Sequence, residues 1–416
     1  MYDLIVAGGG FAGVSAAVSA ARCGLSVLLI EKGGSLGGAA CNAYVNPFMP
    51  YKVKIDGEVR KISDGIFAEI LDNLDKMGGL AKNRVTFSEE ILKLVFDDMC
   101  EKAGVKVLFH AYLSSVSAKD DKIESVTVST KGGPITLSAS YFIDATGDAD
   151  LSVLSGCSYN IGRETDHQCQ PMTLCFRLAG IDKEKFDLDA QKEANELYMK
   201  LLAEGKTLNP RENILLFPYE SDGVVHFNTT RVIKKCPVDA FDVSAAEREA
   251  RLQVYEMFKF LKENARGCEN ATLLSTAPEI GVRQSRQIQG EYILNTDDLK
   301  SLTKFPDRIA ASNYEIDIHS PDGSGTSHYF FGPGEYYTIP YRSLIPKEIK
   351  NLLVAGRCIS STFEAQASYR IMPVCATLGQ AAGIAAAICK EKGCNAIDAD
   401  VSLIQEKLVA AGAFIG

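Results

Sequence analysis

The sequence has few of the residues that hold metal ions. Its 12 cysteines form no C-x-x-C pair, and the closest pairs are Cys169/Cys175 and Cys389/Cys394. Its 5 histidines are scattered along the chain. Zinc and iron–sulfur sites need clustered thiolate or imidazole ligands, so we predict no metal site. Scattered cysteines of this kind are typical of buried thiols in a reducing compartment.

The sequence also has no excess of positive charge and no long apolar run. Its net charge of −9 disfavours nucleic acids and anionic membranes as partners. The Ala-rich stretch 376–389 contains Gln380 and is shorter than the roughly 20 residues that a spanning helix needs. The first apolar stretch begins at Tyr2, which leaves no space for a signal or transit peptide. We therefore expect a cytoplasmic protein that binds neither nucleic acid nor membrane.

The strongest positive pattern lies at the start of the chain. Residues 2–7 (YDLIVA) predict a strand, residues 14–23 are small and Ala-rich and predict a helix, and residues 26–30 (SVLLI) predict a second strand. A glycine-rich turn separates the first strand from the helix. The order strand, glycine turn, helix, strand predicts a βαβ unit of the dinucleotide-binding type.

The chemistry of a dinucleotide explains the spacing of G-x-G-x-x-G in this turn. Gly8 permits the tight turn, Gly10 lets the backbone approach a pyrophosphate, and Gly13 lets helix and strand pack closely. The helix N-terminus offers free N–H groups to the phosphates. Glu31, at the end of the second strand, is placed to accept hydrogen bonds from a ribose.

A second glycine-rich loop, residues 33–40 (GGSLGGAA), indicates which dinucleotide binds. An NAD-binding domain has no need of it, whereas in a flavin protein the ribityl chain and ring extend past the pyrophosphate. With these residues the sequence resembles the FAD-dependent oxidoreductases of the two-dinucleotide-binding-domain type, in the branch related to fumarate reductase and succinate dehydrogenase flavoproteins. The resemblance implies FAD as the cofactor. Cys41, just after the loop, is either a flavin tether or, more simply, a structural thiol.

Two further segments match the same family in the expected order. Residues 141–148 predict a strand ending in Ala-Thr-Gly-Asp, which the resemblance places beside the pyrophosphate. Leu113, after the predicted strand 105–109, is expected beside the adenine, although a plain sheet strand explains it equally well.

The C-terminal part resembles the signature that closes this branch of flavoproteins. Residues 351–357 (NLLVAGR) predict a buried strand that runs into a Gly-Arg loop, and residues 379–383 (GQAAG) are expected to open an Ala-rich helix. The resemblance implies that this helix N-terminus faces the flavin and stabilises the negative charge of its reduced form.

These segments define one set of predicted cofactor-binding residues. The set comprises Gly8, Gly10, Phe11, Ala12, Gly13, Glu31, Lys32, Gly37, Gly38, Ala39, Leu113, Ala145, Thr146, Gly147, Asp148, Gly356, Arg357, Arg370, Gly379, Gln380, Ala381 and Ala382.

The fold class predicted is α/β, with a discontinuous Rossmann-like FAD-binding domain of residues 1–156 and 341–416. Residues 157–340 break the alternating pattern and are expected to form an inserted, mixed α+β substrate or cap domain. They contain no second G-x-G-x-x-G. Without a nicotinamide domain, electrons must pass to or from a substrate or a separate carrier.

Flavin N5 accepts or donates the hydride, so the protein must orient a substrate and handle one proton. The candidates for these tasks are His319, Arg283, Arg286, Tyr337, Arg342 and Arg357. His319 is suited to proton transfer near neutral pH, although a lone histidine is more often structural. The arginines either clamp a substrate carboxylate or form interdomain and surface ion pairs.

The leading hypothesis is an FAD-dependent oxidoreductase that transfers hydride between flavin N5 and a small organic substrate such as a carboxylate or an enone. The alternative is a flavoprotein electron-transfer subunit that works with a separate redox partner. An insert rich in arginine and aromatic residues favours the enzyme. A flavin-dependent RNA-modifying protein is disfavoured by the acidic charge. The direction of the reaction, the electron carrier and the oligomeric state are left open.

Overall fold

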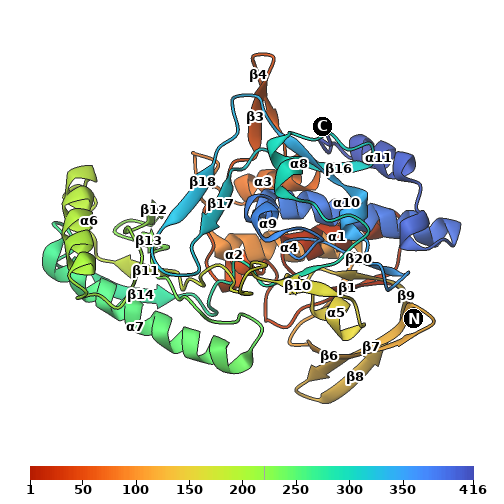
Figure 1. The fold of residues 1–416 in the computed structure, drawn as a ribbon, viewed down its shortest axis with the longest axis horizontal. Helices are drawn as coiled ribbons and strands as arrows, with labels where there is room; N and C mark the ends of the chain where they lie inside the picture. Colours follow the sequence, from red (N-terminus) through yellow and green to blue (C-terminus); the bar gives the residue numbers. More distant parts are fainter. Residues whose placement is uncertain (220) are drawn as a thin grey trace.

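The structure is a computed structural model that describes residues 1–219 and 221–416. Its centre is a five-stranded sheet in the order β20-β9-β1-β2-β5, in which all neighbours are parallel (Figure 1). The strands are β1 (Tyr2–Ala7), β2 (Val27–Ile30), β5 (Lys106–Leu108), β9 (Ala139–Asp144) and β20 (Leu352–Val354). This parallel sheet with helical crossovers confirms the predicted α/β, Rossmann-like fold class.

Both faces of this sheet are covered, because its strands are apolar on both sides. Leu4 and Val6 of β1 belong to the core that contains helices α1 (Phe11–Arg22) and α10 (Met372–Lys392). Ile5 and Ala7 face the opposite core, beneath a meander of β6 (Tyr112–Lys119), β7 (Lys122–Thr130) and β8 (Gly133–Leu137). The alternation along β1 thus places a helical layer on one face and a small antiparallel sheet on the other.

Helix α10 differs from the prediction at its start. It begins at Met372, so the prediction that residues 379–383 open it is wrong. Gly379 and Gly383 lie in the middle of the helix, where an added Cβ would come within 2.0 Å of Ala12 O and 2.2 Å of Ala16 O. These two glycines therefore let α10 pack against the backbone of α1.

The length of α10 also corrects the expected absence of any apolar run of spanning length. Its 21 residues are long and apolar enough to cross a bilayer, but 94% of its most apolar window is buried inside the protein. Such burial is what a core helix between other elements shows.

Further helices and a hairpin complete this body. Ser88 caps α4 by accepting a hydrogen bond from the Ile91 N–H. The elements are α2 (Ala39–Asn42), a hairpin of β3 (Lys52–Ile55) and β4 (Glu58–Lys61), α3 (Ile66–Lys76), α4 (Glu89–Ala103), α5 (Asp150–Leu154), α9 (Phe363–Tyr369) and α11 (Val401–Ala410).

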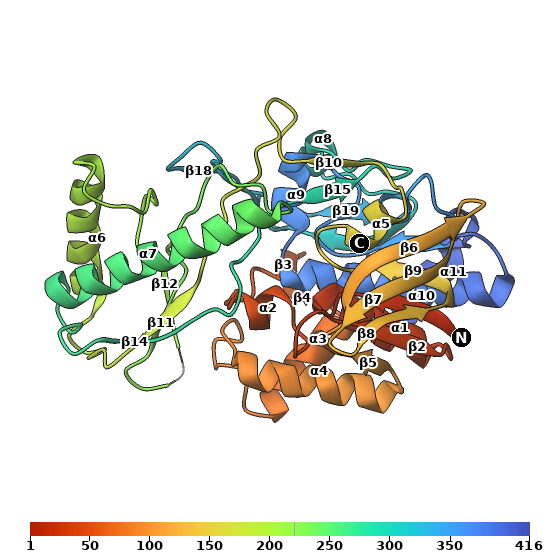
Figure 2. The same cartoon turned by 90° about the horizontal axis from the view of Figure 1, so that it is seen from below.

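Residues 172–282 form a separate group of elements with its own core, which we call the outer lobe. Figures 1 and 2 both show its two long helices standing apart from the parallel sheet. It contains an antiparallel sheet in the order β12-β13-β11-β14. Its elements are β11 (Phe176–Ala179), α6 (Leu188–Ala203), β12 (Leu216–Pro218), β13 (Val225–Phe227), α7 (Ala240–Asn264) and β14 (Thr272–Thr276).

The rest of the predicted insert packs close to the body. Ile309, Ala310 and Tyr337 are buried in the same core as α1 and α10. The elements of this part are the paired strands β10 (Tyr159–Ile161) and β15 (Arg286–Ile288), β16 (Arg308–Ser312) and β19 (Tyr337–Pro340), and β17 (Ile316–His319) and β18 (Thr326–Tyr329), with the short helix α8 (Thr296–Lys300). The boundaries of the cap at residues 157 and 340 stay a prediction.

A buried ion pair ties the outer lobe to the body. Arg177 of β11 and Glu89 of α4 are 6% and 0% exposed, and their charged atoms lie 2.5 Å apart. The guanidinium group lies 4.2 Å from the ring centroids of both Tyr44 and Tyr219. This pair combines charge attraction with cation–π contact on each face.

Candidate functional site

The glycine turn after β1 is shaped by contacts that only glycine allows. Gly8 has φ +98°, and a Cβ there would lie 2.4 Å from Ala145 O. A Cβ on Gly13 would lie 1.7 Å from Gly8 O. At Gly10, by contrast, the nearest atom to an added Cβ is Gly38 Cα at 3.9 Å. The protein itself does not need a glycine at position 10, so the open space above it is available to a ligand.

Glu31 joins the two glycine-rich loops. Its carboxylate is buried and accepts hydrogen bonds from the Gly9 and Gly33 N–H groups, each at 2.7 Å. An ionised carboxylate has further acceptor sites, so Glu31 can also accept from ribose hydroxyls. Glu31 therefore holds the two glycine-rich loops together and also lines the cavity beside them.

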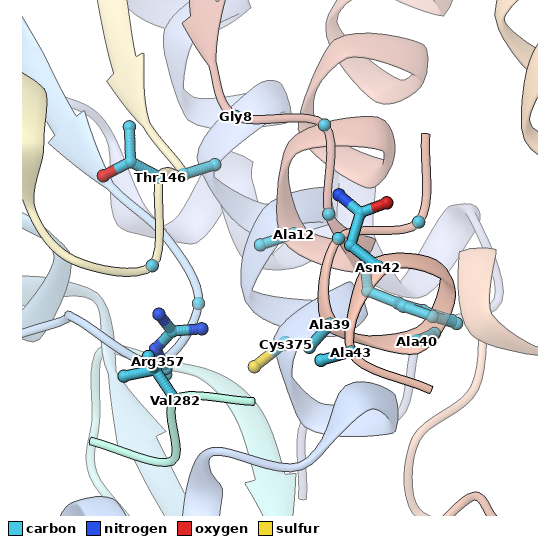
Figure 3. A pocket seen from close by; sticks show the side chains of 18 of the residues that line it. Gly8, Ala12, Ala39, Ala40, Asn42, Ala43, Thr146, Val282, Arg357 and Cys375 are labelled. Atoms are coloured by element: carbon cyan, nitrogen blue, oxygen red, sulfur yellow. The ribbon is translucent and has the colours of Figure 1, made fainter. Parts of the chain in front are cut away.

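A cavity of about 180 Å³, the glycine cavity, follows these loops (Figure 3). Most of the predicted cofactor-binding residues line it. They are Gly8, Gly10, Phe11, Ala12, Glu31, Lys32, Gly37, Gly38, Ala39, Ala145, Thr146, Gly147, Asp148, Gly356, Arg357 and Arg370.

The structure places the other predicted cofactor residues elsewhere. Gly13 packs under the turn, and Leu113 lines a neighbouring cavity. The segment Gly379, Gln380, Ala381 and Ala382 is buried inside α10, where the Gln380 side chain accepts a hydrogen bond from the Ile66 N–H at 3.2 Å. We therefore leave that segment out of the proposed site.

The wall of the glycine cavity includes several residues that the sequence patterns did not indicate. Met372 and Cys375, from the first turn of α10, line the cavity where we predicted the segment 379–382. Pro373 was a usable signal, because proline is favoured in the first turn of a helix. The other unpredicted lining residues are Gly9, Ala40, Asn42, Ala43, Glu279, Ile280, Val282 and Ala355. In Figure 3 the Cys375 sulfur points toward the side of the cavity on which Arg357 lies.

Cys41 does not line the glycine cavity. Its buried thiol points to the Glu89 carbonyl oxygen at 3.6 Å, and burial raises the pKa of Cys41 to about 12. A neutral thiol turned toward α4 favours the structural alternative over a flavin tether.

The cations beside the glycine cavity are paired with carboxylates. Arg357 lies 2.6 Å from Asp148, which also accepts a hydrogen bond from Ser285 Oγ at 2.5 Å. Burial opposes ionisation of Asp148, but Arg357 and Ser285 hold the pKa of this carboxyl below its usual value. Arg286 donates to the Asp148 carbonyl oxygen at 2.7 Å and forms an ion pair with Asp150.

A second cavity, of about 460 Å³, lies beside the carboxyl ends of β1 and β2, and we call it the strand-end cavity. It shares Gly8, Glu31, Lys32, Thr146 and Asp148 with the glycine cavity. Leu113 and Arg286 also line it. Burial, together with Asp148 and Asp144, raises the pKa of Asp150 in its wall to about 6.

A third cavity, of about 410 Å³, lies between the outer lobe and the body, and we call it the arginine cavity. It shares Ala39, Val282, Arg357, Arg370 and Met372 with the glycine cavity. The three cavities therefore adjoin one another in the order strand-end cavity, glycine cavity, arginine cavity.

Two arginines in the arginine cavity, one buried and one half-buried, have no carboxylate partner among the described residues. Arg283 donates to Pro171 O at 2.7 Å and Thr173 Oγ1 at 2.5 Å, both neutral oxygens. Arg211 is 3% exposed; its Nε donates to Asn213 Oδ1 at 3.1 Å, and its Nη1 has no partner among the described residues. Burial, and then the charges of Arg211 and Arg370, lower the pKa of Arg283 to about 9.

His319 also lines the arginine cavity, and both of its ring nitrogens are engaged. Arg231 Nη2 lies 3.0 Å from Nδ1, and a guanidinium can only donate, so Nδ1 is the acceptor. The proton is therefore on Nε2, which lies 3.3 Å from Asp317 Oδ2. Burial, and then the charge of Arg283, lower the pKa of His319 to about 3, so the ring is neutral near pH 7.

Asp317 is the centre of a small polar network in this cavity. Its Oδ2 accepts from the Tyr314 hydroxyl at 3.1 Å and from Arg370 at 3.3 Å. Burial alone would raise the pKa of Asp317, but His319 and Arg370 hold it well below its usual value. Asp317, Tyr314, Arg211, Glu212 and His328 line the cavity and were not among the predicted site residues.

Of the predicted catalytic residues, only Arg283 and His319 lie in the arginine cavity together with Arg357. Arg286 lines the strand-end cavity instead. Tyr337 is fully buried and pairs with Ser368 Oγ at 2.8 Å. Arg342 is 44% exposed at its side chain and pairs with Asp307 at 2.9 Å.

Comparison with known proteins gives two kinds of similarity. Thiamine thiazole synthase from Methanococcus vannielii is 30% identical over 162 residues, which are 37% of this chain and 58% of that protein. The same enzyme from Methanococcus aeolicus is 27% identical over 167 residues, 36% of this chain and 56% of that protein. The chain thus spans little more than half the length of these curated relatives.

Among solved structures, a geranylgeranyl bacteriochlorophyll reductase-like protein from Thermoplasma acidophilum has a TM-score of 0.49 and 14% identity, covering 99% of this chain and 84% of that one. The p-nitrophenol 4-monooxygenase of Pseudomonas putida has a TM-score of 0.44 and 11% identity, covering 98% and 84%.

The residues along the glycine cavity fit FAD. Gly10 leaves room for a pyrophosphate, Glu31 has acceptor sites for a ribose, and the N-terminal turn of α10 lies beyond them. The FAD dependent oxidoreductase family matches residues 3–408, nearly the whole chain. The narrower likeness to the fumarate reductase branch stays a prediction. By its sequence match, and with a cavity suited to the cofactor, the chain belongs to the family of FAD-dependent oxidoreductases.

Proposed function

We propose that the protein transfers hydride between bound FAD and a small organic carboxylate. The observation that carries this proposal is the pair of guanidinium groups of Arg211, which is buried, and Arg283, which is half-buried, in one cavity without a carboxylate partner among the described residues. A buried charge without a counter-ion is costly, by several kcal/mol in proteins. A carboxylate of the substrate supplies the missing negative charge and gives these residues a role.

The position of the arginine cavity supports a reaction with the cofactor. Arg357, Arg370 and Met372 line both this cavity and the glycine cavity. When bound, FAD supplies a two-electron centre that accepts or donates hydride. Arg211 and Arg283 bind the carboxylate and so orient the rest of the substrate toward the shared wall. A neutral enone leaves both guanidinium groups unpaired, so the carboxylate is the better supported of the two substrate classes.

The hydrogen bonds around Asp317 fix which atoms of His319 and Tyr314 carry a proton. His319 donates through Nε2 and accepts at Nδ1, so it positions Asp317 and has no free nitrogen for a substrate. The Tyr314 hydroxyl lines the cavity and is hydrogen bonded to Asp317. Burial raises the pKa of Tyr314, so the hydroxyl stays protonated and donates its hydrogen bond to Asp317.

The alternative of an electron-transfer subunit gives no role to the two guanidinium groups, Arg211 and Arg283, that line a cavity of about 410 Å³ without a carboxylate partner among the described residues. We propose a separate electron carrier or a second substrate as the other redox partner. We also propose a cytoplasmic location, which the scattered free cysteines support.

The test uses the FAD-loaded protein without oxygen, mixed with a panel of small acids and their methyl esters. Saturated acids that are donors should bleach the flavin absorbance, or unsaturated acids should restore it after chemical reduction. Arg342→Ala serves as a control because its guanidinium lies outside the cavity. The proposal is wrong if the neutral esters react as fast as the acids.

A further inference from the structure

The outer lobe forms part of the wall at both ends of the series of three cavities. At one end it forms part of the arginine cavity. At the other, residues 237–244 form one wall of the strand-end cavity, opposite the ends of β1 and β2 and the start of β6. These residues include the first turn of α7, whose N-terminal end lies toward the body in Figures 1 and 2. No sequence pattern indicated a role for this segment in the site.

The wall that residues 237–244 present to this cavity is apolar. Pro237, Val238 and Val243 line it, and Val238 is 37% exposed. The polar side chains of the segment are already engaged within it. Asp239 accepts from the Phe241 and Asp242 N–H groups at 3.0 and 2.9 Å, and Ser244 donates to Ala240 O at 2.7 Å.

The opposite end of the same cavity is polar. Glu31, Lys32 and Asp148 line it and also line the glycine cavity. A ligand in the strand-end cavity therefore has a polar part beside the glycine turn and a flat apolar part near Leu113 and Val243. An adenosine joined to a pyrophosphate has this distribution of polarity.

We infer that residues 237–244 of the outer lobe enclose the adenosine half of FAD. The adenine lies between Leu113 of the body and the Val238 and Val243 side chains of the outer lobe. FAD is then held by both parts of the protein, and its release requires the outer lobe to move away. This inference depends on FAD as the cofactor and not on the proposed substrate.

Polar contacts close to this wall hold the two parts together. Ser285 and Arg286, three and four residues after the end of the outer lobe, bind Asp148 of the body and anchor that end of the lobe, and Arg286 also pairs with Asp150. Glu279 of the outer lobe pairs with Lys32 at 3.1 Å. An outer lobe that moves away from the body must break the Glu279–Lys32 pair.

The test measures how fast FAD leaves the loaded protein, from the rise in fluorescence of free flavin after dilution. Val238→Asp and Val243→Asp place a carboxylate against the adenine. Each should speed release by about tenfold or more. The matched control is Leu252→Asp, on the same helix, 60% exposed and outside the strand-end cavity. Its release rate should equal that of the wild type.

A measurement on the wild-type protein tests the inference even if an aspartate substitution disturbs folding. Amide hydrogen exchange of the wild-type protein is compared with and without FAD. We expect FAD to slow exchange at residues 237–244 as well as at the glycine turn. The inference is wrong if FAD protects the glycine turn but leaves residues 237–244 unchanged, or if both valine variants release FAD within about a factor of two of the control.

Discussion

The arginines on the two sides of the glycine cavity differ in how their charges are paired. Beside the glycine turn, Arg357 and Arg286 each pair with a carboxylate. In the arginine cavity, Arg211 and Arg283 have only neutral oxygens as partners among the described residues. The protein therefore balances its charges where backbone groups and a helix N-terminus meet the cofactor. It leaves a positive charge uncompensated where we place the substrate.

The largest effect is expected at the cofactor end, from Gly10→Val. The protein has open space above Gly10, so the variant should fold. The valine side chain would fill the position of the pyrophosphate, and the purified protein should be colourless. Absorbance near the usual flavin bands measures this, with circular dichroism as the check of folding. Normal flavin content in a folded variant would remove the basis for the cofactor site.

Replacing a paired buried cation should destabilise the protein. Arg177→Met leaves the Glu89 carboxylate, which is 0% exposed, without its counter-ion. The free energy of unfolding should fall by about 3–5 kcal/mol, as measured by urea denaturation. A loss below about 1 kcal/mol would show that this ion pair contributes no more than a surface pair.

Replacing an unpaired buried cation should have the opposite effect on stability. Arg283→Met removes a charge that burial and neighbouring arginines disfavour, so the ligand-free protein should become more stable, by roughly 1–3 kcal/mol. Binding of carboxylates should be lost in the same variant. Arg342→Met is the control, with a change of about 0–1 kcal/mol because its ion pair is exposed. A less stable Arg283→Met protein would contradict the contrast between the two kinds of cation.

The prediction with the smallest effect near neutral pH concerns a buried histidine. Burial, and then Arg177, lower the pKa of His226 to about 3 from 6.5. Between these values the unfolded chain binds a proton that the folded protein does not, so stability rises with pH in this window and falls as pH drops from 6.5 to 3. His226→Phe should flatten this dependence by up to ~1.4 kcal/mol per pH unit. Urea denaturation at several pH values measures it, and an unchanged slope would contradict the assigned pKa.

The cofactor half of the site could be predicted because its determinants are close in the sequence. The turn at Gly8 and Gly13 and the acid at Glu31 follow from backbone constraints within one βαβ unit. The predicted start of α10 was wrong because, in a sequence, glycines that let two helices pack closely look like glycines at the beginning of a helix. Pro373 was the better marker of that start.

The substrate half could not be predicted in the same way. Arg211 lies in a loop without periodicity, and the partner of His319, Arg231, comes from a distant part of the chain. Whether an arginine is paired or unpaired depends on which segments the fold brings together. For that reason Arg283, Arg286 and Arg342 looked equivalent in the sequence and have three different environments in the structure.

The central claim is that the arginine cavity binds an anion through unpaired guanidinium groups. The most direct measurement is a titration of the FAD-loaded protein with unreactive small carboxylates and their methyl esters, followed by the change in flavin absorbance. We predict that the acids perturb the spectrum of the wild type, that the esters do not, and that Arg283→Met abolishes the response to the acids. Equal responses to acid and ester, or an unchanged response in Arg283→Met, would contradict the account.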